Sequence, residues 1–317
     1  MRCLHARRDG TVRIEVHLAE TSDSPSPLWR YTVAFNAENK GARRVLVTEE
    51  TVSHRDDPTA RLNRPRPDDR NDTALRTQTH LQQVQTNAGF RDIADFFSGV
   101  LYLHLVPQLL KYADQLRGQA LEHDPFGQSL LEHVARTPEK TRTARLRRIE
   151  AALRLAIPQF NDLKFVRDGA TGQPHLEVQY KHHRPNAGWQ REEQWSDGTL
   201  RLFGLCWSLL DSNTLLLLEE PELSLNDAIV RQVPLILQQL QRNSKRSRQV
   251  ILSTHSDALL STPIDGRGIL RLEAGDEGTK VVPPTETEVS LLLSGLTPAE
   301  VILPKARPEH ADQLRLF

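Results

Sequence analysis

Two adjacent carboxylates close a short apolar run in TLLLLEEPELSLN, residues 214–226. Glu219 and Glu220 follow four leucines, so both come at the end of a strand that the pattern predicts to be buried. Mg²⁺ prefers hard oxygen ligands and usually takes one or two protein carboxylates. The next carboxylate can orient or deprotonate an attacking water. This stretch therefore predicts a magnesium-dependent hydrolytic site.

Two further polar groups stand at the ends of predicted elements. Ser196-Asp197-Gly198-Thr199 begins a helix, where free backbone N–H groups bind anions and glycine permits close backbone approach. His255 ends the apolar run VILSTHS and can donate a hydrogen bond to a phosphate oxygen. Each group alone also fits a simpler interpretation: a helix cap, a structural histidine, or a strand that meets a surface turn. Their order and spacing together favour one site.

The elements that carry these groups alternate along the chain. The segment after Ser196 predicts a helix, and LLLL predicts a short strand covered on both faces. After these, AIVRQVPLILQQLQR predicts a second helix, and VILSTHS predicts a second apolar strand. Helix and buried strand in alternation indicate an α/β layered sheet. Functional groups in such sheets gather at the C-terminal ends of the strands.

The N-terminal half shows other patterns. Alternation in 12–18, 29–35 and 45–47 predicts half-buried, antiparallel strands. Residues 53–73 are charged and proline-rich, which predicts a solvated loop. Residues 92–113 mix helical and strand-like spacing and remain unassigned. Residues 140–157 predict an amphipathic helix, and 163–168 with 175–183 predict a hairpin.

Composition restricts the class of protein. The 317 residues carry 41 basic and 41 acidic side chains, so no global field attracts nucleic acid or an anionic membrane, although a local patch remains open. Cys3 and Cys206 are the two cysteines, which fits a reducing compartment. The N-terminus has no apolar signal core, and no stretch approaches the ~18 to 20 apolar residues of a membrane span. We expect a soluble cytoplasmic protein.

Segment 195–260 resembles the C-terminal half of an ABC-type ATPase head, in the branch that includes RecF, SMC proteins and AAA_21-like ATPases. SDGTLR resembles the ABC signature, LLLLEEPELSLN the Walker B strand and D-loop, and ILSTHS the switch-histidine loop. The resemblance implies a P-loop NTPase-type layered sheet with an antiparallel strand lobe and a helical insertion. It also implies ATP and Mg²⁺ as cofactors.

The resemblance assigns roles by position. Glu219 would sit at the magnesium-associated acid, Glu220 would be the catalytic glutamate, and His255 would sense the γ-phosphate. The D-loop would span 223–226, and the signature would contact the nucleotide of the opposite subunit. The implied nucleotide-binding residues are Ser196, Gly198, Thr199, Ser224 and Asn226. A head-to-head homodimer, or a pair with a partner ATPase chain, follows from this arrangement.

Two departures from the family pattern stand out. The Walker B acid is normally aspartate, and a water-mediated magnesium contact tolerates the longer Glu219. The second departure is the phosphate-binding loop, because no G-x-x-x-x-G-K-[ST] occurs in the sequence. The first segment is absent from this sequence, was lost, or comes from another polypeptide. We expect an incomplete N-terminus, and ATP hydrolysis then depends on a Walker A segment from a longer N-terminus or a partner.

Four segments are expected. They are an antiparallel strand lobe (1–52), a charged loop with a helical insertion (53–160), the ATPase core (161–303) and a flexible tail (304–317). We expect an ATPase in DNA maintenance or anti-phage defence. The alternative is a non-hydrolysing module that docks on a partner ATPase or the sliding clamp. A nuclease of the overcoming-lysogenization type with a fused Toprim domain is disfavoured, since the 62 residues after His255 hold no DxD.

Two short segments suggest partners. The C-terminal QLRLF resembles bacterial clamp-binding peptides through Gln313, Leu314, Leu316 and Phe317, although an ordinary tail that packs on the domain is the favoured interpretation of so short a motif. The basic loop RNSKRSRQ, 242–249, is either a DNA-phosphate contact or a solvated loop after a helix C-terminus.

Overall fold

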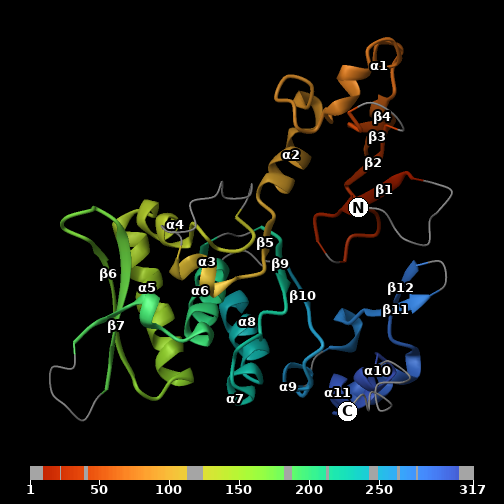
Figure 1. Cartoon of the computed structure of the whole chain (residues 1–317). Helices are drawn as coiled ribbons and strands as arrows, with labels where there is room; N and C mark the ends of the chain where they lie inside the picture. Colours follow the sequence, from red (N-terminus) through yellow and green to blue (C-terminus); the bar gives the residue numbers. More distant parts are fainter. Residues whose placement is uncertain are drawn as a thin grey trace, which may run out of the picture. The chain divides into compact units, whose positions relative to one another are not determined.

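The computed structural model falls into two compact units, which are described separately (Figure 1). One unit comprises Met1–Gly99 and Leu272–Lys280, and the other comprises Val100–Arg271 and Val281–Phe317. The structure describes residues 10–21, 23–38, 42–112, 124–181, 188–211, 214–242, 249–262, 265–275 and 278–306. The four segments predicted from the sequence remain a prediction.

A four-stranded antiparallel sheet forms the first unit, in the order β1-β2-β3-β4. This confirms the antiparallel strands predicted from the alternating pattern. The strands are β1 (Val12–Leu18), β2 (Trp29–Ala37), β3 (Val45–His54) and β4 (Asp57–Arg64). The helices after them are α1 (Pro67–Asn71), η1 (Thr73–Thr77), η2 (Ala88–Phe90) and α2 (Arg91–Ser98). Strands β11 (Arg271–Gly275) and β12 (Gly278–Val282) form a separate two-stranded sheet.

The prediction of a solvated loop over 53–73 is wrong. Residues 57–64 form β4, which pairs with β3, and 67–71 form α1. The charged side chains that suggested a solvated loop are in part buried, because Arg64 and Asp69 neutralise each other inside the unit. Charge therefore misled the prediction here.

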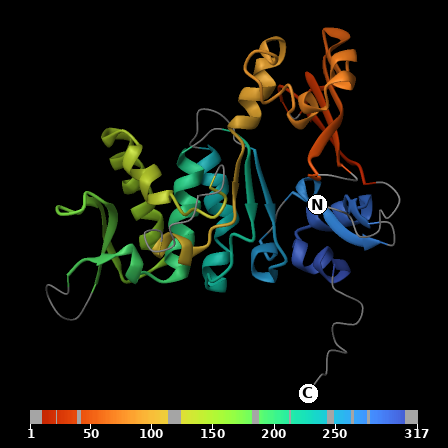
Figure 2. The ribbon, with the colours of Figure 1, turned by 45° about the horizontal axis from the view of Figure 1, so that its top comes forward.

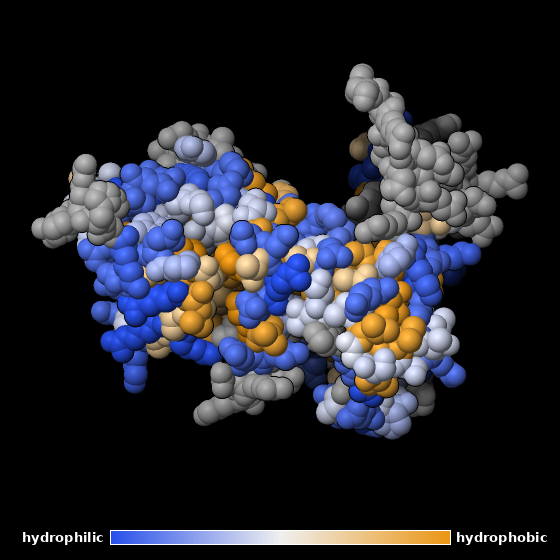
Figure 3. All heavy atoms as spheres, turned by 90° about the horizontal axis from the view of Figure 1, so that it is seen from below, coloured by the Kyte–Doolittle hydropathy of each residue, from blue (hydrophilic) through white to orange (hydrophobic). Residues whose placement is uncertain are grey.

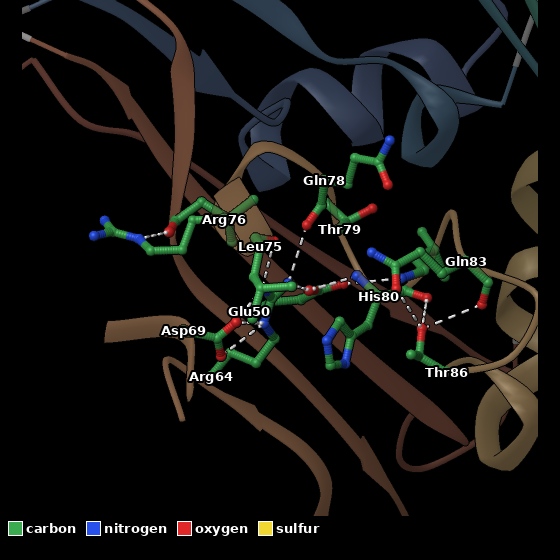
Figure 4. A network of polar contacts seen from close by, with 12 residues as sticks. Glu50, Arg64, Asp69, Leu75, Arg76, Gln78, Thr79, His80, Gln83 and Thr86 are labelled. Atoms are coloured by element: carbon green, nitrogen blue, oxygen red, sulfur yellow. Dashed lines mark hydrogen bonds and ion pairs between the residues drawn. The ribbon is translucent and has the colours of Figure 1, made fainter. Parts of the chain in front are cut away.

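Arg64 is the centre of a buried polar network (Figure 4). Its Nη1 donates to Glu50 Oε2 at 2.9 Å, and its Nε donates to Asp69 Oδ2 at 3.0 Å. The guanidinium also donates to two backbone carbonyls, Leu75 O at 2.9 Å and Gln78 O at 3.1 Å. Because one side chain contacts strand, helix and loop, it attaches the segment after β4 to the sheet.

Glu50 completes this network from β3. Its side chain is fully buried and accepts hydrogen bonds from the backbone N–H groups of His80 (2.8 Å) and Leu81 (3.0 Å). The hydroxyl of Tyr31 donates to the same carboxylate at 3.3 Å. Burial, with the nearby Glu50 charge, raises the pKa of Tyr31, so the phenol stays protonated as the donor.

The second unit is built around a parallel three-stranded sheet of order β10-β9-β5. Its strands are β5 (Leu101–Leu103), β9 (Leu216–Glu219) and β10 (Val250–Ser253). In Figures 1 and 2, α6 (Asp197–Asp211) and α8 (Val233–Arg242) lie on the same side of this sheet. The predicted alternation of helix and parallel strand is confirmed.

The sheet is covered on one face only, within the described residues. Leu216 and Leu218 are 0% and 3% exposed and belong to the core formed with α6. The other face carries the row Tyr102, Leu217 and Ile251, which are in register across the three strands. Tyr102 and Ile251 are 38% and 52% exposed. The expectation that the LLLL strand is covered on both faces is therefore wrong for the part of the chain described.

A helical and antiparallel region extends the core of the second unit. Helix α5 (Glu139–Ala156) confirms the predicted amphipathic helix, and β6 (Phe160–Arg167) pairs antiparallel with β7 (Pro174–Tyr180) as predicted. The remaining early elements are α3 (Pro107–Lys111), α4 (Leu130–Arg136), β8 (Gln190–Arg191) and η3 (Glu192–Gln194). The later ones are α7 (Asp227–Val230), α9 (Asp257–Leu260), η4 (Gly266–Gly268), α10 (Glu286–Leu293), α11 (Pro298–Val301) and α12 (Leu303–Ala306).

Two predicted contact segments lie outside the described residues. These are the QLRLF tail, within 307–317, and nearly all of the basic loop, at 243–248. Among the helices that the structure describes, none is both long and apolar enough to cross a membrane.

Replacing Arg64 by Met should strongly destabilise the first unit. The change leaves two buried carboxylates, Glu50 and Asp69, without their cation, and breaking a buried ion pair costs about 3–5 kcal/mol. Chemical denaturation, followed by circular dichroism, measures this loss. Arg30→Met is the matched control, because Arg30 lies exposed on β2, and it should change the free energy of unfolding by less than about 0.5 kcal/mol.

The same network predicts a pH dependence. Hydrogen bonds from Arg64 hold the pKa of Asp69 at about 2, below its ordinary 3.8. A lowered pKa stabilises the fold above pH 3.8, and this contribution is lost as the pH falls through about 2. Arg64→Met should weaken this loss between pH 4 and 2. An unchanged acid transition in the variant would contradict the assignment.

Candidate functional site

The parallel pairing of β9 and β10 brings the predicted catalytic pair together. Ser253 is in register with Glu219, so both strands end at the same edge. One residue later, the backbone N–H of Glu220 donates to Ser253 O at 3.0 Å. The Nδ1 of His255 lies 2.6 Å from Oε1 of Glu220. The carboxylate and the imidazole thus meet at the carboxyl ends of neighbouring strands, as the sequence predicts.

The chain turns sharply after β9. Glu220 and Ser224 adopt positive φ angles of 43° and 63°, a region that few non-glycine residues occupy. Such backbone is held in place by its surroundings and is concentrated at functional sites. The turn aims Glu220 at His255 and leads into α7, whose N-terminus is capped by the Asn226 side chain through Ala228 N at 2.9 Å.

Glu219 has a partner that the sequence did not indicate. The hydroxyl of Tyr102, on the neighbouring strand β5, donates to the Glu219 carboxylate. This hydrogen bond raises the pKa of Tyr102. The Tyr102 side chain reaches Glu219 because β5 is parallel to β9, a pairing that the mixed spacing of residues 92–113 did not reveal.

The start of α6 is a capped helix N-terminus. Ser196 Oγ accepts a hydrogen bond from Thr199 N at 3.1 Å and lies 2.8 Å from Thr199 Oγ1. This is the geometry of a helix cap, and the same free end of the helix can face an anion. The two interpretations of SDGT are therefore compatible.

Gly198 sets the distance between the signature and the D-loop. A Cβ placed on Gly198 would lie 2.6 Å from Ser224 O, and real Cβ atoms do not approach a backbone atom that closely. The two segments, 26 positions apart in sequence, are therefore in direct backbone contact. Glycine is needed at position 198 for this close approach rather than for its φ angle.

Helix α3 neutralises the acidic residue of the signature. Lys111 Nζ lies 2.8 Å from Asp197 Oδ1, and Gln108 Nε2 donates to Asp197 Oδ2 at 2.7 Å. An unpaired carboxylate beside a helix N-terminus would repel a phosphate. The pairing removes much of that repulsion. Sequence reasoning missed both partners, because they lie almost 90 positions away.

A buried carboxylate joins the turn after β9 to the loop after β10. Glu222 is 7% exposed and accepts a hydrogen bond from the Thr254 hydroxyl. The Thr254 oxygen also accepts from Ser256 N at 3.0 Å. The D-loop and the switch-histidine loop are thus held to each other next to the Glu220–His255 pair.

A second group of potential metal ligands is better explained by hydrogen bonding. His175, Glu192 and Glu193 lie close enough to share an ion. However, His175 Nδ1 is 2.8 Å from Glu192, and its Nε2 faces the Arg191 guanidinium at 3.4 Å. A cation beside Arg191 would be repelled. The cluster therefore stabilises the β7-β8 region.

The site suits magnesium better than it suits a whole nucleotide. Glu219 and Glu220 present hard oxygen ligands at a solvent-accessible edge, as Mg²⁺ requires. No segment of the sequence supplies the successive N–H groups and lysine of a phosphate-binding loop. The sequence thus offers carboxylates suited to a magnesium ion but no phosphate-binding-loop motif.

A parallel sheet with a carboxylate–histidine edge beside a capped helix is the arrangement that the sequence resemblance to ATPase heads leads us to expect. A sequence model of the AAA_21 family, described as "AAA domain, putative AbiEii toxin, Type IV TA system", matches residues 8–261. The chain therefore belongs to this family of AAA ATPase domains. Membership confirms the predicted recognition and fold class.

Solved SMC heads resemble the chain at low identity. An SMC head bound to the C-winged helix domain of ScpA is 14% identical, over 85% of this chain and 78% of that one, with a TM-score of 0.41. A Pyrococcus furiosus SMC head is 12% identical, the match covers 86% of this chain and 81% of that one, and the TM-score is 0.38. The Thermotoga maritima SMC head is 13% identical, the match covers 83% of this chain and 77% of that one, and the TM-score is 0.35. These scores are too low to transfer residue roles. No curated protein matches the chain.

Gly198→Ala should separate the signature from the D-loop. The added methyl group meets Ser224 O, and overpacking of this kind costs about 1–3 kcal/mol. Thermal unfolding measures the loss. Gly169→Ala is the matched control, since its added Cβ meets nothing within 4 Å and should leave the midpoint nearly unchanged. Equal midpoints for the two variants would show that the close contact does not exist in solution.

Proposed function

We propose that this chain is the catalytic half of an ABC-type ATPase head, which hydrolyses ATP with Mg²⁺ once a phosphate-binding loop is in place. The observation that carries the proposal is the 2.6 Å contact between Glu220 and His255 at adjacent strand ends. This contact occurs in a chain that belongs to an AAA ATPase family. ATPase activity and nucleotide binding fit both facts.

Glu220 is the general base in this mechanism. Its carboxylate accepts the proton of the attacking water, and His255, in contact with it, fixes its orientation and faces the terminal phosphate. Glu219 would hold the magnesium ion, with Tyr102 orienting its carboxylate. When bound, Mg²⁺ neutralises charge on the phosphates.

A second head completes the site in this proposal. The signature residues Ser196 and Gly198 would face the nucleotide held by the opposite head, with the D-loop residues Ser224 and Asn226 beside them. Thr199 was also expected to face it, but it is 5% exposed and would instead support the Ser196 hydroxyl from within the helix. The pairing of Asp197 with Lys111 supports this, because it removes a negative charge from the surface that must approach phosphates. The assembly is a head-to-head homodimer or a pair with a partner ATPase chain.

The missing phosphate-binding loop has a place in the sheet. Strand β10 is at the end of the order β10-β9-β5, so its outer edge is unpaired within the described residues. Ile251 on this strand is 52% exposed, although it is apolar. A parallel strand added at this edge would end beside Glu220 and His255, where a phosphate loop is needed. We propose that the loop arrives on such a strand.

Glu220→Gln should abolish ATP hydrolysis in a protein that includes the phosphate-binding loop. The amide cannot accept the proton of water, so kcat should fall by about 10²- to 10⁴-fold while nucleotide binding persists. Phosphate release measures the rate, and a fluorescent nucleotide measures binding. Glu132→Gln, an exposed carboxylate on α4, is the matched control and should retain full activity. Unchanged turnover in Glu220→Gln would disprove the assigned role.

The second candidate is a non-hydrolysing module that docks on a partner ATPase or the sliding clamp. The lack of a phosphate-binding loop in the sequence favours it. Charge-assisted hydrogen bonds contribute about 1.5–3 kcal/mol each, and a micromolar complex requires only about 8 kcal/mol in total. Losing four or five of them would remove useful ATP affinity.

Both candidates predict that the 317-residue chain alone releases phosphate no faster than its Glu220→Gln variant. The coding DNA separates them. Reading the coding DNA upstream of Met1 in frame should then reveal G-x-x-x-x-G-K-[ST] if the chain is part of an enzyme. A stop codon close upstream supports the module or a split protein.

For the role, we propose DNA maintenance or phage defence in the cytoplasm, with DNA and the clamp as candidate partners.

A further inference from the structure

An apolar groove lies in the second unit and is lined by none of the residues predicted for the site. It encloses about 630 Å³ between helices α5, α6, α7 and α8. Its lining is mostly aliphatic and includes Ile149, Ala152, Leu155, Leu210, Ile229 and Ile236. Nothing in the proposed ATPase mechanism uses this groove.

The groove exposes side chains that a helical core normally covers. Leu155 on α5 is 89% exposed, and Leu235 on α8 is 42% exposed. Cys206 also lines the groove and is buried. Burial raises the pKa of its thiol to about 12, so the thiol stays neutral and acts as part of an apolar wall. On the face drawn in Figure 3, hydrophobic residues reach the surface between hydrophilic ones. Uncovered aliphatic side chains of this kind mark contact sites.

One unpaired cation borders the groove. Arg148 lines it and forms no ion pair with any described residue, and the lining includes no carboxylate. Two other arginines of α5 are paired, Arg145 with Asp211 and Arg154 with Glu150, whereas Arg142 and Arg147 form no ion pair with a described residue and lie outside the groove lining. Gln232 and Gln239 supply the remaining polar groups of the lining. The groove therefore complements an apolar surface that carries a negative charge.

We propose that this groove binds an amphipathic α-helix of a partner protein, whose apolar stripe is flanked by an acidic side chain that pairs with Arg148. A helix is about 10–12 Å across and presents anchors at i, i+3, i+4 and i+7. Those anchors suit a groove whose walls are themselves helices, here α5 and α8. The positive charge of Arg148 favours an incoming helix that has an acidic side chain on the flank facing it.

The position of the groove links it to the carboxylate edge. Two of its walls, α6 and α7, begin at Asp197 and Asp227, directly after Ser196 and Asn226. A helix seated in the groove would thus contact the C-terminal half of α6, through Cys206 and Leu210, and the first turn of α7, through Ala228 and Ile229. The binding proposal itself does not depend on ATPase activity.

Two fluorescent peptides test the proposal. Both carry the same leucine stripe on a helical frame, one with glutamates along the flank and the other with lysines. Fluorescence anisotropy should show that the 317-residue chain binds the glutamate peptide about tenfold more tightly or better, since 1.4 kcal/mol is tenfold. Arg148→Glu should reverse this preference. Leu155→Asp should weaken binding of both peptides by about tenfold.

Matched controls locate the binding. Arg147 is the exposed neighbour of Arg148 on α5 but does not line the groove, so Arg147→Glu should leave the preference unchanged. Leu293→Asp replaces a leucine that is 75% exposed on α10 and should not affect binding. The altered side chains are exposed, and circular dichroism verifies that each variant folds.

Four results would overturn the proposal. The first is the absence of binding at about 1 mM peptide, which corresponds to about 4 kcal/mol, and the second is an equal effect of Arg147→Glu on the peptide preference. The third is self-association of the free chain that Leu155→Asp abolishes, because this assigns the groove to a second copy of the chain. The fourth is tighter peptide binding after deletion of 307–317, because this assigns the groove to the chain's own tail. Reversal by Arg148→Glu alone, with intact controls, supports it.

Discussion

The candidate site depends on the parallel, in-register pairing of β9 with β10. Because Glu219 and Ser253 are paired, the next residues of both strands emerge at one edge, where Glu220 and His255 meet. A shift of one residue would turn alternate side chains to the other face of the sheet and separate this pair. The apolar faces of Leu216 and Leu218, packed under α6, fix the register. Hydrophobic burial on one face thus determines where the polar chemistry lies.

Much of this could be predicted from the sequence, because the relevant signals are local. The apolar runs before Glu219 and after residue 249 are strand-length, and the helix between them has its own period. Parallel strands joined by a helix must end at the same edge. Residue type and order were therefore enough to place Glu220 near His255 and to start α6 at the signature.

The unpredicted features depend on contacts distant in sequence. Tyr102 and Lys111 come from a stretch without clear periodicity, and only the three-dimensional fold brings them to Glu219 and Asp197. Strand β4 was hidden by its charges, since nothing local reveals that Arg64 is buried against Glu50. Likewise, the four consecutive leucines indicate that their strand is buried, but they do not indicate whether one or both faces of the sheet are covered. Local patterns therefore predict elements, whereas pairing and cover depend on the whole fold.

The bare face of the sheet has a practical consequence for solubility. Strand β10 is apolar and at an edge, and apart from its short length it carries none of the charges, prolines or bulges by which proteins protect such edges. Its unpaired backbone groups can pair with another strand, and Tyr102 and Ile251 leave apolar surface exposed on the adjoining face. The 317-residue chain should therefore become less soluble as its concentration rises. Producing it together with a segment that completes the sheet should raise the concentration at which it stays in solution.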